Sequence, residues 1–327
     1  MTAPDPPPRP IADTPESGPA PLFQPIPPGH KSGYVALVGA PNVGKSTLLN
    51  RLLGTKLSIV SARPSTTRNR VLGILSETTA EPPYQLVFLD TPGVVRPKYR
   101  LHDHMMRDVD RALGDADVTV FLADATEARI THDAASALAK LERFSGTSLL
   151  ALNKVDALPS PDEALPLVAL YQDRHDFEEV VPISALHGNG TEALLELILA
   201  RIPEGPPYYP PEQISEHPER FFVAEIVREA IFDHFREEVP YSTSVVVVTF
   251  EERARQKDFV AADIVAERDS QKAILIGKGG QALKRLGKRA RLGIEDFLGR
   301  PVYLQLHVKT RADWRNKEGH LREYGYG

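Results

Sequence analysis

One nine-residue stretch, Gly39-Ala-Pro-Asn-Val-Gly-Lys-Ser-Thr47, constrains the architecture of this chain more than any other. It fits the pattern GxxxxGK[ST], a glycine-rich loop whose backbone N–H groups cradle phosphates. The motif requires a strand before it and a helix after it. The apolar run 34–38 precedes it and a leucine-rich segment follows. An ordinary strand-to-helix turn that uses glycine for its φ freedom is the alternative. The stretch predicts a nucleotide-phosphate site in an α/β fold.

Length and composition indicate a globular protein of two domains. The chain has 327 residues, which is long for one core, and its 42% hydrophobic and 25% charged residues are ordinary values. No run approaches the roughly 20 apolar residues that span a bilayer. Because the chain has no cysteine, disulfides, thiolate zinc sites and cysteine nucleophiles are excluded. We expect a cytoplasmic protein.

Proline marks both ends of the first domain. Residues 1–32 hold 11 of the 29 prolines and show no helical or strand period, which predicts a disordered Pro-rich tail. A second cluster, at residues 205–211, cannot form a regular element. The sequence thus predicts a tail at 1–32, a first domain at 33–203, a linker at 204–218 and a second domain at 219–327.

Six strand-like runs alternate with helical segments in the first domain. They are residues 34–38, 71–75, 84–89, 118–123, 148–152 and 180–183. This alternation predicts a mostly parallel sheet with helices on both faces. The second and third runs are joined by a short turn-prone segment, so we expect an antiparallel hairpin and a mixed six-stranded sheet. The last helix is expected to open with a capping box between Asn189 and Glu192.

The phosphate loop and one later motif are predicted to hold a triphosphate and Mg²⁺. The loop residues Asn42, Val43, Gly44, Lys45, Ser46 and Thr47 would wrap the β-phosphate with their N–H groups. Lys45 would bridge the β- and γ-phosphates, and Ser46 would ligate Mg²⁺. In Asp90-Thr-Pro-Gly93, Asp90 would hold Mg²⁺ through water and the Gly93 N–H would meet the γ-phosphate.

Two further motifs follow strand-like runs, and they indicate which base of the nucleotide is bound. Asn153, Lys154 and Asp156 form an NKxD motif, in which the Asp156 carboxylate can accept hydrogen bonds from guanine N1–H and N2–H₂. Adenine lacks this donor pair, so the buried carboxylate would stay unpaired. Ser184, Ala185 and Leu186 follow the last run, and the Ala185 N–H would meet guanine O6. The sequence therefore predicts GTP and GDP as ligands.

The order of these motifs resembles that of the translation-factor-related GTPases, and this resemblance assigns a switch. Pro64-Ser-Thr-Thr-Arg68 occupies the place of the first switch. Thr67 is therefore expected to be the switch ligand of Mg²⁺, with Thr66 as the alternative. The predicted catalytic residues are Lys45, Thr67 and Gly93.

Two positions near the γ-phosphate bear on the rate of hydrolysis. Val94 stands where Ras-like enzymes have a water-positioning glutamine, so we expect slow intrinsic turnover. Asn42 lies in a Pro-Asn-Val-Gly-Lys-Ser context that resembles potassium-stimulated relatives. K⁺ is therefore a further candidate cofactor.

The second domain carries a predicted RNA-binding loop. Its expected order is α-β-β-α-α-β, and Gly277-Lys-Gly-Gly280 is a GxxG loop that lets backbone approach a single strand closely. Residues 268–317 hold 13 Lys or Arg against 4 Asp or Glu, a net charge of +9, which favours a polyanion. Order and loop resemble a type II KH domain, an α+β fold. The predicted RNA contacts are Ile276, Gly277, Lys278, Gly279, Gly280, Lys284, Arg285 and Lys288.

Residues 34–326 as a whole resemble the bacterial Era GTPase family, which also accounts for the motifs Val239-Pro-Tyr-Ser242 and Val308-Lys-Thr-Arg-Ala-Asp-Trp314. The resemblance implies a GTP-hydrolysing switch that binds small-subunit ribosomal RNA near its 3′ end and acts in 30S assembly, with a monomer expected. The alternative is a membrane-associated or cell-cycle signalling GTPase with peripheral membrane contact. A KH protein whose nucleotide site is merely structural is another.

Overall fold

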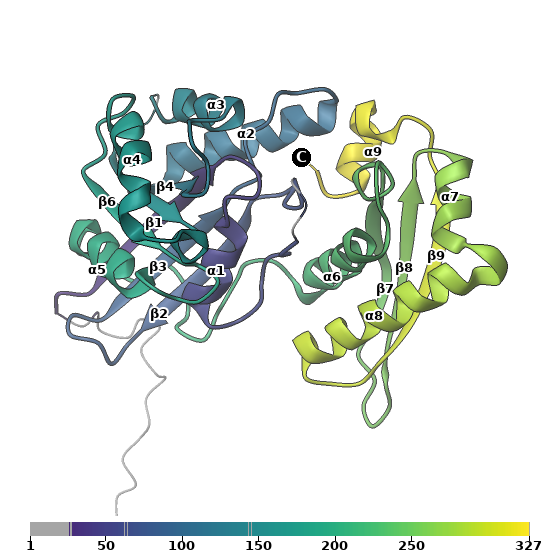
Figure 1. Cartoon of the computed structure of the whole chain (residues 1–327). Coiled ribbons are helices and arrows are strands. Elements are labelled where there is room, and N and C mark those ends of the chain that lie inside the picture. Colours follow the sequence, from purple (N-terminus) through teal and green to yellow (C-terminus); the bar gives the residue numbers. More distant parts are fainter. Residues whose placement is uncertain are drawn as a thin grey trace, which may run out of the picture.

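The computed structural model describes residues 26 and 28–326, apart from residues 62, 64, 143 and 145. Two domains lie side by side, and the C-terminus lies between them (Figure 1). The predicted tail falls largely outside the described residues. The elements of the first domain are β1 (Lys31–Gly39), α1 (Lys45–Leu53), β2 (Val71–Glu77), β3 (Tyr84–Asp90), α2 (Arg100–Asp115), β4 (Val118–Asp124), α3 (His132–Leu141), β5 (Thr147–Asn153), α4 (Leu165–Gln172), β6 (Glu179–Ile183) and α5 (Thr191–Arg201).

The first domain is built on one six-stranded sheet in the order β2-β3-β1-β4-β5-β6. Only β2 and β3 pair in antiparallel fashion; the other neighbours are parallel. Consecutive residues of β1, Val35 to Val38, are all fully buried, which is the pattern of a strand covered by helices on both faces. The predicted mixed sheet is confirmed.

The strand order explains where a ligand can bind. Strand β3 pairs with β1 on one side, and β4 pairs with β1 on the other side. In such a sheet the crevice lies beyond the carboxyl ends of the strands, where the order reverses. The phosphate loop joins β1 to α1 at that edge, and β3 and β5 end there at Asp90 and Asn153.

Two details of the predicted first domain are wrong. Strand β1 begins at Lys31, inside the predicted tail, because Lys31 and Ser32 continue the pairing of β1 with β3. Helix α5 has no capping box at Asn189: its N-cap is Gly190, whose φ of 72° lies in the left-handed region. A Cβ there would come within 2.4 Å of the Pro182 carbonyl oxygen, so this turn requires glycine.

The second domain follows the expected α-β-β-α-α-β order, which confirms the type II KH fold. Strands β7 and β8 are antiparallel, and β8 and β9 are parallel. One face of this sheet packs against α6 and α8, with Val260, Ala262 and Ile264 fully buried. The elements are α6 (Glu219–His234), β7 (Ser244–Glu251), β8 (Asp258–Ala266), α7 (Asp269–Ile276), α8 (Gln281–Leu298), β9 (Val302–Thr310) and α9 (Glu318–Glu323).

The segment after β9 returns to the first domain. Trp314 is fully buried, stacks on Tyr326 and donates from Nε1 to the Ser242 carbonyl oxygen at 2.9 Å. His104 of α2 hydrogen-bonds Glu318 at 3.1 Å. The C-terminal segment therefore packs against both domains. Within the described part of the chain, no helix has the length and apolar character needed to cross a membrane.

Candidate functional site

A cavity of about 510 Å³ opens at the carboxyl edge of the six-stranded sheet. Twelve of the predicted site residues line it: Asn42, Gly44, Lys45, Ser46, Thr47, Thr67, Gly93, Asn153, Lys154, Asp156, Ala185 and Leu186. Val43, Asp90 and Ser184 are buried behind the wall. Residues as far apart in the sequence as Asn42 and Leu186 thus surround one space of the size that small ligands occupy.

The phosphate end of this cavity is formed by the glycine-rich loop. Gly44 has φ 102°, and a Cβ there would lie 2.1 Å from Asn153 Nδ2, so the loop and the NKxD motif approach too closely for a side chain. Lys45 is buried and donates to the Gly39 and Ala40 carbonyl oxygens at 3.3 and 2.8 Å. Burial lowers the pKa of the Lys45 ammonium to about 8, against the opposing effect of the Asp90 carboxylate. A phosphate would restore a full partner to this cation.

The three predicted Mg²⁺ ligands converge. Ser46 Oγ donates to Asp90 Oδ2 at 2.7 Å and lies 3.0 Å from Thr67 Oγ1, so Thr67 is the donor in the second bond. Asp90 is fully buried, and its Oδ1 has no hydrogen-bond partner among the described residues. Burial raises the pKa of the Asp90 carboxyl, while the Ser46 hydrogen bond and the Lys45 charge oppose the rise. An orphaned carboxylate oxygen beside two hydroxyls fits a hydrated Mg²⁺ ion.

The base end is joined to the phosphate loop by Asn153. Its Nδ2 donates to the Val43 carbonyl oxygen at 2.7 Å, and its Oδ1 accepts from the Ala185 N–H at 2.9 Å. The N–H predicted to meet guanine O6 is therefore engaged within the protein here. Asp156 is partly exposed and lies 3.7 Å from His187, and Lys154 pairs with Asp124 at 2.5 Å.

The first switch is attached to the KH domain through Arg68, for which the sequence predicted no role. This guanidinium is buried and donates to the carbonyl oxygens of Thr243, Pro240 and Tyr241 at 2.6, 3.1 and 3.0 Å. It also lies 5.9 Å from the centre of the Trp314 ring. Arg68 directly follows Thr67, so a candidate Mg²⁺ ligand and a domain contact are neighbours in the chain.

Other contacts reinforce this connection. Arg63 donates to the Phe235 carbonyl oxygen, and Lys56 pairs with Glu229 of α6 at 2.6 Å. Two motifs noted in the sequence meet at this interface: residues 239–242 supply carbonyl acceptors for Arg68, and residues 308–314 supply Trp314. The acceptor role of residues 239–242 was not predicted, because every residue type has a backbone carbonyl group and the sequence does not show which of them accepts a hydrogen bond.

The predicted RNA-binding loop joins α7 to α8. Gly277, Gly279 and Gly280 all have positive φ, of 71°, 57° and 75°. A Cβ on Gly277 would lie 2.6 Å from the Ala282 Cβ, whereas at Gly279 and Gly280 it would meet open space. Gly277 is thus required by packing, and the other two leave the backbone accessible.

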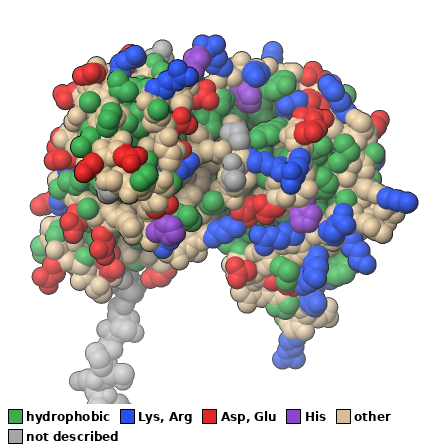
Figure 2. All heavy atoms as spheres, in the orientation of Figure 1, with side chains coloured by type: hydrophobic (Ala, Val, Ile, Leu, Met, Phe, Trp, Pro, Cys, Tyr) green, Lys and Arg blue, Asp and Glu red, His purple; other side chains and the backbone are tan. Residues whose placement is uncertain are grey.

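Cations surround this loop. Lys278, Lys284, Arg285 and Lys288 are all exposed, and Ile276 is partly buried. Figure 2 shows Lys and Arg side chains gathered over α8 and the loop before it, while Asp and Glu are more frequent on the first domain. The accessible backbone and the surrounding charge suit a sugar-phosphate chain.

Fold and sites define a class, a P-loop GTPase joined to a type II KH domain. Residues 34–154 match the family described as 50S ribosome-binding GTPase, and residues 238–315 match the KH domain family. The chain is 48% identical over 301 residues to "GTPase ERA-like, chloroplastic" of Arabidopsis thaliana and 46% identical over 305 residues to "GTPase ERA1, chloroplastic" of Zea mays. These alignments cover 91% of this chain and 69% and 71% of the relatives.

Solved structures of Era proteins have the same fold over nearly the whole chain. Era from Aquifex aeolicus bound to GDP and AlF₄⁻ superposes with a TM-score of 0.85 at 41% identity, covering 91% of this chain and 99% of that one. An Era complex with MgGDPNP and nucleotides 1506–1542 of 16S ribosomal RNA gives the same values. The chain belongs to the Era GTPase family. It is an enzyme that hydrolyses GTP to GDP and phosphate.

Proposed function

We propose that this chain is a GTP-driven RNA-binding switch that holds 16S ribosomal RNA near its 3′ end and acts in assembly of the 30S subunit. One observation carries the proposal. The phosphate pocket and the GxxG loop lie in one chain, and the first switch reaches the KH domain through buried Arg68. The Era complex that contains this RNA segment supports the choice of ligand.

The geometry of the pocket supports the proposed nucleotide contacts. Ser46 and Thr67 would hold Mg²⁺ directly and Asp90 through water, since their oxygens already converge. When bound, Mg²⁺ neutralises charge on the β- and γ-phosphates. Lys45 would donate to the same phosphates, and Asp156 would accept from the guanine edge.

The water that attacks the γ-phosphate needs a group that this chain does not place at position 94. Val94 is buried, and its N–H donates to the Gly39 carbonyl oxygen at 3.2 Å. An apolar side chain cannot orient water, so slow intrinsic turnover is proposed. A K⁺ ion held with the help of Asn42 would supply charge near the phosphates.

Nucleotide state reaches the RNA site through the first switch. A γ-phosphate with Mg²⁺ orders such a loop, and hydrolysis releases it. Because Arg68 follows Thr67 directly and donates to three KH-domain carbonyl groups, a movement of Thr67 would strain or relax the domain contact. The chain is further proposed to act as a monomer in the cytoplasm; peripheral membrane association remains the alternative.

The test is cross-linking of the protein to RNA in cells lysed with a GTP analogue or with GDP, followed by sequencing. The expected result is enrichment of the 3′ end of 16S ribosomal RNA with the GTP analogue and loss of this enrichment with GDP. Enrichment of unrelated RNA, or equal recovery in both nucleotides, would contradict the proposal. The Gly279→Asp variant serves as the background control.

A further inference from the structure

The loop after β6, residues 184–188 and here called the guanine loop, lines the nucleotide cavity with Ala185 and Leu186. Strand β6 lies at the edge of the six-stranded sheet and pairs with β5. From β5, Asn153 Oδ1 accepts from the Ala185 N–H at 2.9 Å. A loop at the edge of a sheet has few neighbours, so any further contact from the rest of the domain bears directly on its position.

Arg51, in the last turn of α1, makes such a contact. Its Nε donates to the Ala185 carbonyl oxygen at 3.4 Å, and its Nη2 donates to the Leu186 carbonyl oxygen. The side chain also packs along the loop, since a Cβ on Gly188 would lie 3.7 Å from Arg51 Cδ and Nε. Hydrogen bonds from a charged donor are stronger than neutral ones, and the planar guanidinium fixes the direction of both bonds. One side chain thus holds the carbonyl groups of both residues that line the cavity.

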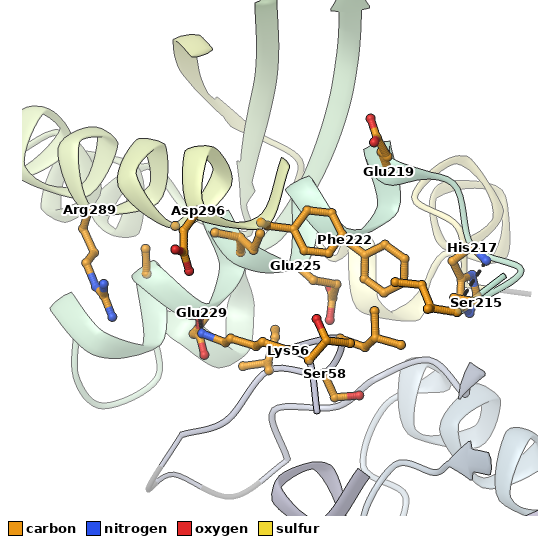
Figure 3. A pocket seen from close by; sticks show the side chains of 18 residues that line it. Lys56, Ser58, Ser215, His217, Glu219, Phe222, Glu225, Glu229, Arg289 and Asp296 are labelled. Atoms are coloured by element: carbon orange, nitrogen blue, oxygen red, sulfur yellow. Dashed lines mark hydrogen bonds and ion pairs between the residues drawn. The ribbon is translucent and has the colours of Figure 1, made fainter. Parts of the chain in front are cut away.

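The turn of α1 that carries Arg51 is itself held from the opposite side. The neighbouring Asn50 Oδ1 accepts from two N–H groups of the segment 55–59, both at 2.9 Å. Figure 3 shows where this segment meets the KH domain: Lys56 pairs with Glu229 at 2.6 Å, beside a cavity of about 450 Å³ between the domains. Arg51 therefore reaches the guanine loop from a well-supported turn.

We propose that Arg51 is a positioning residue for guanine recognition, which holds the guanine loop where its backbone N–H groups meet O6 of the base. The inference rests on the guanine site of the proposed function. Because Asn153 already accepts from the Ala185 N–H, O6 has to share that donor or use the next one, the Leu186 N–H. Either arrangement needs the loop in a fixed place, since a hydrogen bond weakens steeply as its angle departs from linear.

The position of Arg51 also joins the two ends of the nucleotide site through one helix. Helix α1 begins with Lys45 and Ser46, which are proposed to hold the phosphates and Mg²⁺, and carries Arg51 in its last turn. An α-helix is rigid over so short a length, with a rise of about 1.5 Å per residue. The helix therefore sets the separation between the phosphate end of the cavity and the loop that meets the base.

The test compares the affinities of the full chain, with Mg²⁺, for GDP and for 6-thio-GDP, in which sulfur replaces O6. The wild-type protein should prefer GDP. In Arg51→Ala, the affinity for GDP should fall roughly tenfold, the size expected when one hydrogen bond to the base is lost. The affinity for 6-thio-GDP should change less than about twofold, because sulfur is a weak acceptor and has little to lose.

IDP shows whether the effect is confined to O6. IDP keeps O6 but lacks the 2-amino group that would donate to Asp156, so Arg51→Ala should weaken GDP and IDP equally and leave their ratio unchanged. Arg51→Lys keeps the charge without the planar fork, and its preference for GDP over 6-thio-GDP should lie between those of Arg51→Ala and the wild type.

Arg174→Ala is the matched control. It removes an exposed arginine in the turn between α4 and β6, at the amino end of β6 and therefore at the opposite edge of the sheet from the cavity. This variant loses the same charge as Arg51→Ala and should bind all three nucleotides as the wild type does. A loss of GDP affinity equal to that of Arg51→Ala would mean that net charge alone is being measured, and would overturn the inference.

The remaining outcomes separate the inference from the proposed function. If Arg51→Ala keeps the wild-type preference for GDP over 6-thio-GDP, whether both affinities hold or both fall alike, Arg51 does not act through O6 and the inference fails. A changed ratio of GDP to IDP affinity would place the effect at Asp156 and overturn it as well. Both results leave the proposed function intact. Wild-type protein that binds ADP as tightly as GDP would refute the guanine site itself, and with it the proposed function.

Discussion

The nucleotide pocket and the RNA-binding loop use backbone and charge in opposite ways. In the pocket, Lys45 and Asp90 are buried and already have partners: Lys45 donates to the Gly39 and Ala40 carbonyl oxygens, and Asp90 accepts from Ser46. In the loop, Lys278 and its neighbouring cations are exposed and the backbone at Gly279 faces open space. The pocket is organised for one small, rigid ligand. The loop is organised for one point on a long polymer.

The difference also sets how each site responds to its surroundings. Burial lowers the pKa of Lys45 to about 8. This cation has therefore already lost its water in the free protein, and ligand binding does not have to remove it. The exposed cations of the loop keep their water until RNA binds and releases counterions. RNA affinity should therefore fall steeply with salt, while nucleotide affinity should change little.

The largest effect expected concerns the pocket. Lys45→Ala removes the one cation of the loop, which is expected to donate to the β- and γ-phosphates, so GTP turnover should fall on the order of 10² to 10³-fold. Phosphate release measured with the wild-type chain as reference checks this. RNA retention without nucleotide should persist. Turnover equal to that of wild type would favour a merely structural nucleotide site.

A change in the GxxG loop should have the opposite pattern: RNA binding should fall and nucleotide binding should persist. Gly279→Asp places a carboxylate beside the predicted RNA phosphates and forces a side chain onto φ 57°, so RNA retention on filters should fall at least about tenfold. GDP affinity should not change. Gly299→Asp carries the same charge and a similar φ of 65° at the other end of α8, and it should bind RNA normally. An equal loss in both variants would mean that net charge alone is being measured.

Arg68 tests whether the two sites depend on each other. Arg68→Ala removes the buried guanidinium that donates to three carbonyl groups, of which, among the described residues, only that of Pro240 has a further donor, Thr243 Oγ1; this should lower the free energy of unfolding by about 3 kcal/mol in denaturant titrations. RNA affinity should then differ less between the GTP analogue and GDP. Arg70→Ala, which removes a partly exposed pair with Asp115, should cost under about 1 kcal/mol. An undiminished nucleotide effect on RNA in Arg68→Ala would show that coupling runs elsewhere.

The smallest effect concerns the cation requirement of hydrolysis. Turnover should be higher in KCl than in NaCl at matched ionic strength, because the pocket has an apolar residue at Val94 and gains from an added charge. Asn42→Ala should remove this difference without abolishing nucleotide binding. Equal rates in both salts for the wild-type chain would refute a role for K⁺.

Sequence motifs anticipated much of the nucleotide pocket because each motif follows a strand of one sheet. Asp90, Asn153 and Ser184 come directly after or at the end of β3, β5 and β6, and parallel strands bring those ends to one edge. Local rules failed at the start of α5, where Gly190 caps the helix in place of Asn189. There, the close approach of the Pro182 carbonyl oxygen overrides the capping preference.

The sequence by itself determined the ligand classes, since residue type and spacing specify which atoms can meet phosphate, guanine and RNA. Tertiary structure alone decided how the sites are joined. Arg68 contacts carbonyl groups more than 170 positions away, and Glu229 reaches Lys56 across a similar separation. Carbonyl acceptors carry no sequence signature. In the sequence, a glutamate on a helix cannot be told from an ordinary surface charge, and only the packing of the two domains shows that Glu229 is buried.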